Sequence, residues 1–158
     1  MKRFFVFTLT VLFATTFLFL TNLIAESDSD KGYKLGGDVY GYAYVSTGFD
    51  FPYATSYHDA HVWNYSGRAI KYYCTFKATV SGPSEIEPKK AEPEGWVEID
   101  GFAFESDYFR FNMRGKERGW YTITGKSDLD VKVDLNGDGD FDVFPSWRAS
   151  IFTPFEIE

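Results

Sequence analysis

The chain has 158 residues, of which 44% are hydrophobic and 25% are charged, and its formal net charge is −7 at pH 7. This length suits one domain with a buried core rather than two domains. The acidic balance argues against binding to nucleic acid or to anionic membranes, because both are polyanions.

The N-terminus has the pattern of a secretory signal peptide. Lys2 and Arg3 precede an apolar run over residues 4–20, and Ala25 stands just before an acidic stretch. A basic start, an apolar middle and a small residue at the boundary predict a signal peptide over residues 1–25, cleaved after Ala25. The apolar run is long enough to cross a bilayer, so an uncleaved membrane anchor is the alternative. Either way, we expect the folded part to be secreted, extracellular or periplasmic.

The rest of the chain begins with a polar segment and continues as a β-type pattern. Residues 26–37 are polar and contain glycines, which predicts a flexible leader. From residue 38 onward, apolar and polar residues alternate, most clearly from Ile70 to Val80. This alternation is typical of a strand with one buried face and one solvated face.

Similar runs follow one another along residues 38–158. They are Val39 to Ser46, Ala60 to Tyr65, Trp96 to Phe104, Tyr108 to Met113, Trp120 to Gly125, Leu129 to Leu135, Phe141 to Phe144 and Trp147 to Phe152. Turn signals separate them, among them Gly125 to Asp128, and we expect long loops over residues 48–56 and 83–95. Eight or nine such strands predict an all-β fold, a single antiparallel β-sandwich that is immunoglobulin-like or jelly-roll-like.

One segment, residues 134–142, has the spacing of a calcium-binding loop. Side-chain oxygens stand at loop positions 1, 3, 5 and 9, and a backbone carbonyl is available at position 7. These residues are Asp134, Asn136, Asp138, Asp142 and, through its carbonyl, Asp140. Gly139 occupies the position where the loop must turn sharply and where positive φ is needed. Because Ca²⁺ prefers oxygen ligands, the sequence predicts a calcium site held by these five residues.

The residues on either side of the loop indicate which class of calcium-binding loop it belongs to. Both flanks, Val131 to Val133 and Val143-Phe144, are strand-like, and Pro145 replaces the position-12 glutamate of an EF-hand. The loop therefore resembles the strand-flanked calcium loop of FG-GAP-type propeller repeats, over roughly 11 residues. The resemblance implies that Asp142 is the last acidic ligand, and it extends to the loop and not to the fold. We expect calcium to stabilise the hairpin; an acidic turn without metal is the alternative.

Aromatic residues make up 20% of the chain. Tyr40, Tyr42 and Tyr44 alternate along one run and so share a face, and Trp96 begins another run. Aromatic rings can stack on sugar rings, although strand aromatics also pack in cores. The sequence thus predicts a secreted or cell-surface calcium-binding β-domain with a binding or structural role. The alternative is a carbohydrate-binding module that uses these four residues, with a polysaccharide or another surface protein as its partner.

Enzymatic activity is the weaker interpretation of this sequence, and we expect that the protein is not an enzyme. The stretch from Trp96 to Asp100 is similar to the Glu-x-Asp core of jelly-roll retaining glycosidases. Its alternation places Trp96, Glu98 and Asp100 on one face of a strand. Retaining chemistry needs a second, nearby carboxyl group, and this chain has Phe102 or Ala103 where that family carries it.

Two other residue types could carry chemistry. His58 and His61 are three residues apart and should point to opposite faces of a strand, which disfavours a shared zinc site. Cys74 is the one cysteine, so no internal disulfide can form, and we expect its thiol to be buried as a small apolar group.

Overall fold

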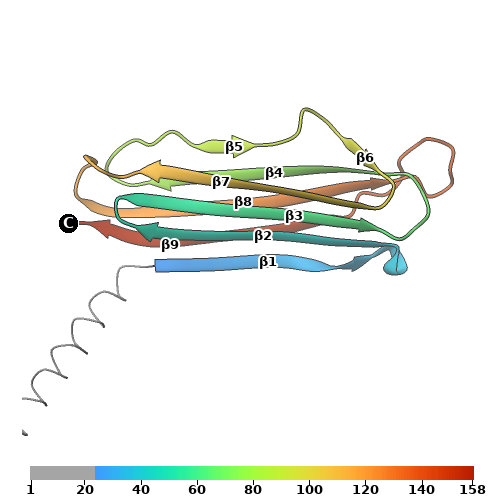
Figure 1. The fold of residues 1–158 in the computed structure, drawn as a ribbon, viewed down its shortest axis with the longest axis horizontal. Coiled ribbons are helices and arrows are strands. Elements are labelled where there is room, and N and C mark those ends of the chain that lie inside the picture. Colours follow the sequence, from blue (N-terminus) through green and yellow to red (C-terminus); the bar gives the residue numbers. More distant parts are fainter. Residues whose placement is uncertain (1–23) are drawn as a thin grey trace, which may run out of the picture.

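The computed structural model describes residues 24–158, which form two antiparallel sheets packed face to face (Figure 1). Its elements are β1 (Ile24–Lys34), the 3-10 helix η1 (Leu35–Gly37), β2 (Val39–Asp50), β3 (Tyr53–Asn64), β4 (Ile70–Ser81), β5 (Lys89–Ala91), β6 (Val97–Ile99), β7 (Phe102–Asn112), β8 (Gly119–Val133) and β9 (Ser146–Ile157). The predicted all-β antiparallel sandwich is confirmed. No helix within this described part is long and apolar enough to cross a membrane.

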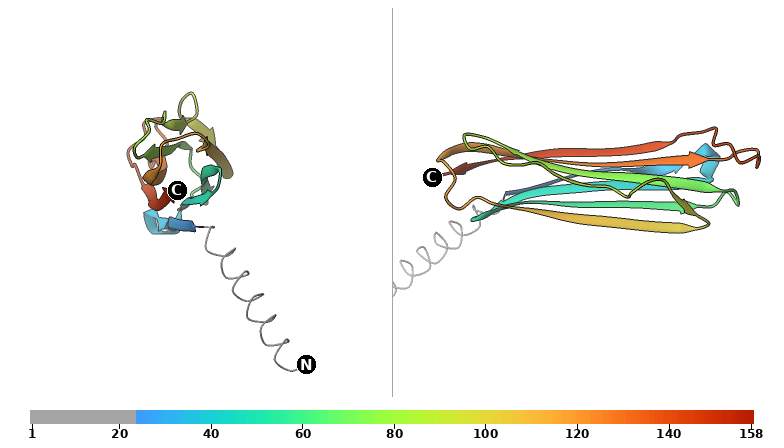
Figure 2. Two further views of the ribbon diagram at one scale, coloured as in Figure 1. Left: turned by 90° about the vertical axis from the view of Figure 1, so that its left-hand side faces the viewer. Right: turned by 90° about the horizontal axis from the view of Figure 1, so that it is seen from above.

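The two sheets divide the strands as follows. Sheet A has the order β1-β2-β3-β7, and sheet B has the order β5-β4-β8-β9, with β6 also paired to β4. The chain builds β1 to β3 as a meander, crosses to sheet B at β4, returns for β7 and crosses again for β8 and β9 (Figure 2). Inward residues of both sheets alternate with outward ones, as predicted for residues 70–80, and together they form one core.

The prediction of a flexible leader over residues 26–37 is wrong. Residues 24–34 form β1, which pairs with β2 from Ile24↔Phe49 to Lys34↔Val39. No side chain of residues 25–34 is buried, so the apolar pattern that indicates a strand is missing from this segment. The predicted signal peptide otherwise lies outside the described residues, and its expected boundary after Ala25 falls within β1.

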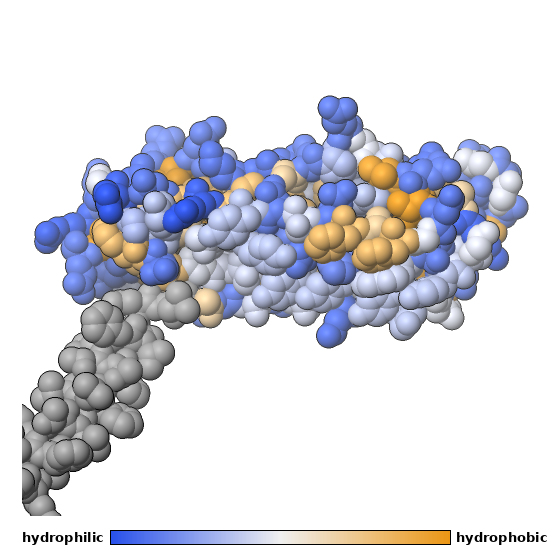
Figure 3. Space-filling model, in the orientation of Figure 1, coloured by the Kyte–Doolittle hydropathy of each residue, from blue (hydrophilic) through white to orange (hydrophobic). Residues whose placement is uncertain are grey.

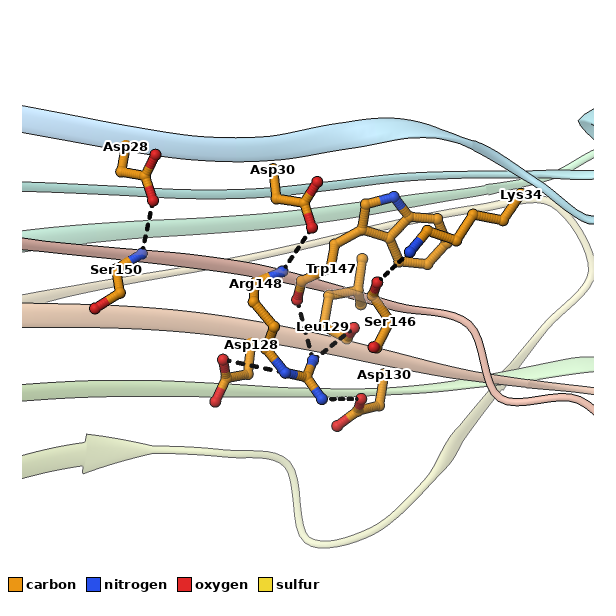
Figure 4. A network of polar contacts seen from close by, with 10 residues as sticks. All are labelled: Asp28, Asp30, Lys34, Asp128, Leu129, Asp130, Ser146, Trp147, Arg148 and Ser150. Atoms are coloured by element: carbon orange, nitrogen blue, oxygen red, sulfur yellow. Dashed lines mark hydrogen bonds and ion pairs between the residues drawn. The ribbon is translucent and has the colours of Figure 1, made fainter.

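Polar contacts to β9 hold β1 in place (Figure 4). Asp28 Oδ2 accepts a hydrogen bond from the backbone N–H of Ser150 at 2.8 Å, and Asp30 Oδ2 accepts one from that of Arg148 at 2.9 Å. The indole Nε1 of Trp147 donates to the carbonyl of Gly32 at 3.2 Å. The edge strands of the two sheets are therefore joined by side chains, which occupies backbone donors that an open edge would leave unpaired.

Several predicted boundaries also differ. β7 is one strand where two were expected, and β8 continues through the predicted turn at residues 125–128 because it pairs along that length with both β4 and β9. Residues 48–56 form a tight hairpin between β2 and β3 rather than a long loop. The expected strand from Phe141 to Phe144 is reduced to a single bridge between Val133 and Val143.

Candidate functional site

The outer face of sheet A carries a row of aromatic rings that crosses all four strands. Tyr33, Tyr40, Trp63 and Phe102 are directly paired from one strand to the next. Their successive ring centroids are 4.9, 5.1 and 4.8 Å apart. The two ends of this row are open to solvent, since Tyr33 is 63% and Phe102 is 54% exposed. We call these four residues the aromatic ladder.

A second, shorter row lies beside the ladder. Tyr42, His61 and Phe104 are paired across β2, β3 and β7, with ring centroids 5.3 and 4.5 Å apart. Within residues 24–158, the Nε2 atom of His61 is the buried side-chain polar atom that has no hydrogen-bond partner. Burial lowers the pKa of His61 and so favours its neutral ring, while the nearby Asp59 carboxylate acts in the opposite direction.

The predicted tyrosines share this outer face, as their alternation indicates. Tyr40, Tyr42 and Tyr44 are all half-buried, and the rings of Tyr42 and Tyr44 are stacked with centroids 6.1 Å apart. Figure 3 looks onto this face, which is pale where tyrosines cover it and orange near β6 and the start of β7. Close by, the Tyr57 hydroxyl donates to Asp59 Oδ1 at 2.8 Å.

Trp96 lies elsewhere, on the outer side of sheet B. Its ring is 5.7 Å from that of Tyr73, and the Lys132 ammonium lies 4.0 Å from the ring centroid. The four predicted ligand residues therefore do not form one site. Trp63 and Phe102 are not among the predicted ligand residues, because their contact depends on the pairing of β3 with β7 and no local sequence pattern indicates it.

The predicted calcium loop joins β8 to β9 and folds around the first of its aspartates. Asp134 is only 5% exposed; its Oδ1 accepts the N–H of Gly137 at 2.7 Å and its Oδ2 accepts that of Gly139 at 2.9 Å. Both glycines have positive φ, 76° and 91°, so the predicted sharp turn at Gly139 is present. Burial raises the pKa of the Asp134 carboxyl, but these backbone hydrogen bonds outweigh it and hold the pKa below its usual range.

The other predicted ligands of the loop also contact its backbone. Asn136 Oδ1 accepts the N–H of Asp138 at 3.2 Å, and Asp138 Oδ1 accepts that of Asp140 at 2.8 Å. The side-chain and carbonyl atoms that could ligate a metal ion are oxygens, which fit the chemistry of Ca²⁺. In this arrangement, however, residues 24–158 contain no cluster of three or more His, Cys, Asp or Glu side chains placed to hold a metal ion.

The two histidines point to opposite faces of β3, as predicted. His58 is fully buried between the sheets, where its Nε2 lies 2.7 Å from the Ser56 hydroxyl and its Nδ1 lies 3.0 Å from that of Ser127. The Ser127 hydroxyl donates to the Tyr44 carbonyl at 2.6 Å, so it accepts from His58 Nδ1–H, and Nε2 accepts from Ser56. Burial lowers the pKa of His58 to about 4, partly opposed by Asp107.

The two remaining residues that could carry chemistry are Glu98, which is in an ion pair, and Cys74, which is buried. Glu98, from the glycosidase-like stretch, projects from β6 and forms an ion pair with Lys71 at 3.4 Å. Cys74 is buried as predicted, and burial raises the pKa of its thiol to about 12, which makes a reactive thiolate unfavourable.

No protein-family model matches the chain, and a search of curated proteins found no match to it.

Proposed function

We propose that this protein is an extracellular binding module whose outer sheet A face binds carbohydrate. The observation that carries this proposal is the aromatic ladder, in which rings in mutual contact cross the sheet and are exposed at both ends. Soluble proteins seldom expose large contiguous apolar surfaces, and such surfaces commonly mark binding sites. Sugar rings offer an apolar face with polar edges, which suits aromatic rings that carry hydroxyl groups.

Residue types on this face favour a sugar over an aliphatic ligand. The outward positions of β2, β3 and β7 hold aromatic, hydroxyl, small and a few charged residues, and no Leu, Ile, Val or Met. Tyrosine is the most frequent aromatic among them, so phenolic donors and acceptors lie next to ring faces.

Retention of the folded domain in native gels that contain polysaccharide tests this proposal. A panel of neutral and acidic polysaccharides should include at least one that slows migration. Tyr42→Ala should weaken retention because it removes a ring from the face. Trp96→Ala serves as the matched control, since it removes a ring from the other sheet and should leave retention unchanged. If no polysaccharide retards the wild-type protein, the proposal is wrong.

A second candidate function, calcium binding, is supported by the loop over residues 134–142. Its spacing provides five oxygen donors, and its glycines adopt the positive φ that such a turn requires. Asp134, Asn136, Asp138 and Asp142 would hold the ion through side chains, and Asp140 would hold it through its carbonyl. Bound calcium would neutralise carboxylates that otherwise repel one another and would thereby stabilise the link between β8 and β9.

Thermal unfolding tests this second function. With a dissociation constant near 10 µM and about 1 mM calcium, binding would stabilise the fold by about 2.7 kcal/mol. For a domain of this size, we expect an increase in Tm on the order of 5–10 °C over the EDTA-treated protein. Asp138→Asn should reduce this increase, whereas Glu117→Gln, an exposed residue next to the opposite end of β8, should not. An unchanged Tm would contradict the proposal.

Residues 1–25 support an extracellular location for both functions. Mass analysis of the protein exported by a heterologous bacterial host tests this point: a chain starting at Glu26 indicates cleavage, and an intact chain in the membrane fraction indicates an anchor. Retention of the protein in the cytoplasm would contradict the proposed location.

A further inference from the structure

We infer that the aromatic ladder is the main ligand subsite and that it takes a neutral glycan of at least three sugar residues lying across the strands. This inference rests on the proposed carbohydrate-binding function and specifies its site, its ligand class and the direction of the bound chain.

The direction follows from the register of sheet A. Tyr33, Tyr40, Trp63 and Phe102 are direct cross-strand partners, so the row they form is perpendicular to the strands. Along the strands, the rows of rings are shorter: on β2, Tyr42 and Tyr44 are stacked and are followed by Ser46. On β3, Trp63 contacts His61 with ring centroids 5.4 Å apart, and the next outward residue is Asp59. A stacked pair presents ring edges to solvent, whereas rings inclined to their neighbours leave parts of their faces open.

The length follows from the number of strands crossed. The ladder spans three steps between neighbouring strands of about 4.8 Å each, roughly 14 Å in all. One step is about as wide as one sugar ring, so a stretch of three rings covers the ladder from Tyr33 to Phe102. Shorter glycans would leave one exposed end of the ladder without a partner.

The neutrality follows from charge. The ladder contains no carboxylate and no basic side chain, while the whole chain carries a net charge of −7. An anionic glycan would therefore meet repulsion from the rest of the molecule without a cationic group in the ladder to offset it. Beside the ladder, Lys31 is paired with Tyr42 in the second row. Lys34 follows Tyr33 directly, but it points to the other face of β1, where its ammonium donates to the Ser146 carbonyl at 2.6 Å.

Calorimetric titration with gluco-oligosaccharides of one to six units tests the length, and matched glucuronate oligomers test the charge. We expect affinity to rise up to three units and to change little beyond that, with the anionic oligomers binding at least ten-fold more weakly. Phe102→Ala and Trp63→Ala should each weaken binding of the trisaccharide roughly five- to ten-fold, the value of one lost stacking contact. Tyr108→Ala is the matched control, because this ring is equally exposed (54%) on the same strand but lies outside the ladder.

The outcomes separate this inference from the function on which it rests. If a glycan binds the wild type and the ladder variants bind it equally well, the ladder is not the subsite, although carbohydrate binding stands. If no glycan in the titration or the gel panel binds, both are wrong; a dimer in light scattering that Phe102→Ala dissociates would then assign the face to a protein partner. Phe102 is exposed, so its variant should fold even if Trp63→Ala does not.

Discussion

Two histidines on the same strand, three residues apart, have opposite environments. His58 points between the sheets, is fully buried and has a partner at each ring nitrogen, Ser56 and Ser127. His61 points outward among aromatic rings, and its buried Nε2 atom has no partner within the described residues. Buried polar groups are normally hydrogen-bonded, so an exception requires a reason.

The comparison separates a structural layer from a candidate binding surface. Between the sheets, polar residues are satisfied by one another: the Thr47 and Thr153 hydroxyls also pair, at 2.6 Å. On the outer face, aromatic rings surround His61 instead, and within the described residues no hydrogen-bond partner reaches its Nε2 atom.

Acidification should destabilise the fold through His58. Its pKa is about 4 in the folded protein and about 6.5 in an unfolded chain, so the unfolded state binds the proton more readily. The stability of the fold that depends on a neutral His58 is fully present above pH 6.5 and is lost as the pH falls from 6.5 towards 4. We expect a loss of about 3 kcal/mol over this range, measured by urea unfolding at a series of pH values.

The matched variants for this prediction are His58→Gln and His61→Phe. The first removes the titrating group and should flatten the dependence of the unfolding free energy on pH between 6.5 and 4. The second should leave most of that dependence in place. Equal slopes in the wild type and His58→Gln would show that other groups, such as carboxylates, control acid stability.

Removing one partner of His58 should have the next largest effect. Ser127→Ala leaves Nδ1–H of His58 without an acceptor and removes a hydrogen bond to the Tyr44 carbonyl. Because an unpaired buried donor retains its desolvation cost, we expect a loss of about 2 kcal/mol in the free energy of unfolding at pH 7. Ser150→Ala, at an exposed position of β9, is the control and should change the free energy of unfolding little. A loss of less than 0.5 kcal/mol in Ser127→Ala would mean that water replaces the hydroxyl.

Gly125 tests how closely the two sheets approach at this layer. A Cβ atom there would lie 2.5 Å from Val45 Cγ2 and 2.7 Å from Ser56 Oγ, closer than real Cβ contacts. Gly125→Ala should therefore destabilise the fold by overpacking, by about 1–2 kcal/mol after the usual gain from replacing a strand glycine. Gly95→Ala, where nothing lies within 4 Å, is the control. Equal stability of the two variants would show that the layer can expand without strain.

The same two faces show how far the sequence determines what can be predicted. Alternation is a local pattern, so it predicted the sandwich, the buried face of β4 and the opposite orientations of the two histidines. β1 escaped prediction because main-chain pairing and the Asp28 and Asp30 carboxylates hold it, and neither leaves an apolar pattern. Gly125 resembled a turn residue, yet it serves close packing.

The candidate sites divide in the same way. Spacing along the chain predicted the residues of the loop and the turn at Gly139, because both are local. Alternation likewise placed the tyrosines of β2 on one face. The ladder required the pairing of β3 with β7, which joins Trp63 to Phe102 across nearly forty positions of sequence, and no local pattern specifies that register.

His61→Phe should have the smallest effect on stability, and its sign is informative. The substitution removes an unpartnered buried nitrogen and inserts a ring of similar shape between Tyr42 and Phe104, which are already in aromatic contact with this position. Replacing an unsatisfied polar group by an apolar one is close to neutral or stabilising, so we expect a change within about 0.5 kcal/mol or a gain. His58→Phe is the contrasting variant, because it leaves two buried hydroxyls unpaired and should destabilise strongly. A loss above 1 kcal/mol for His61→Phe would mean that Nε2 has a partner in solution, and the distinction between the satisfied inner face and the unsatisfied outer face would then fail.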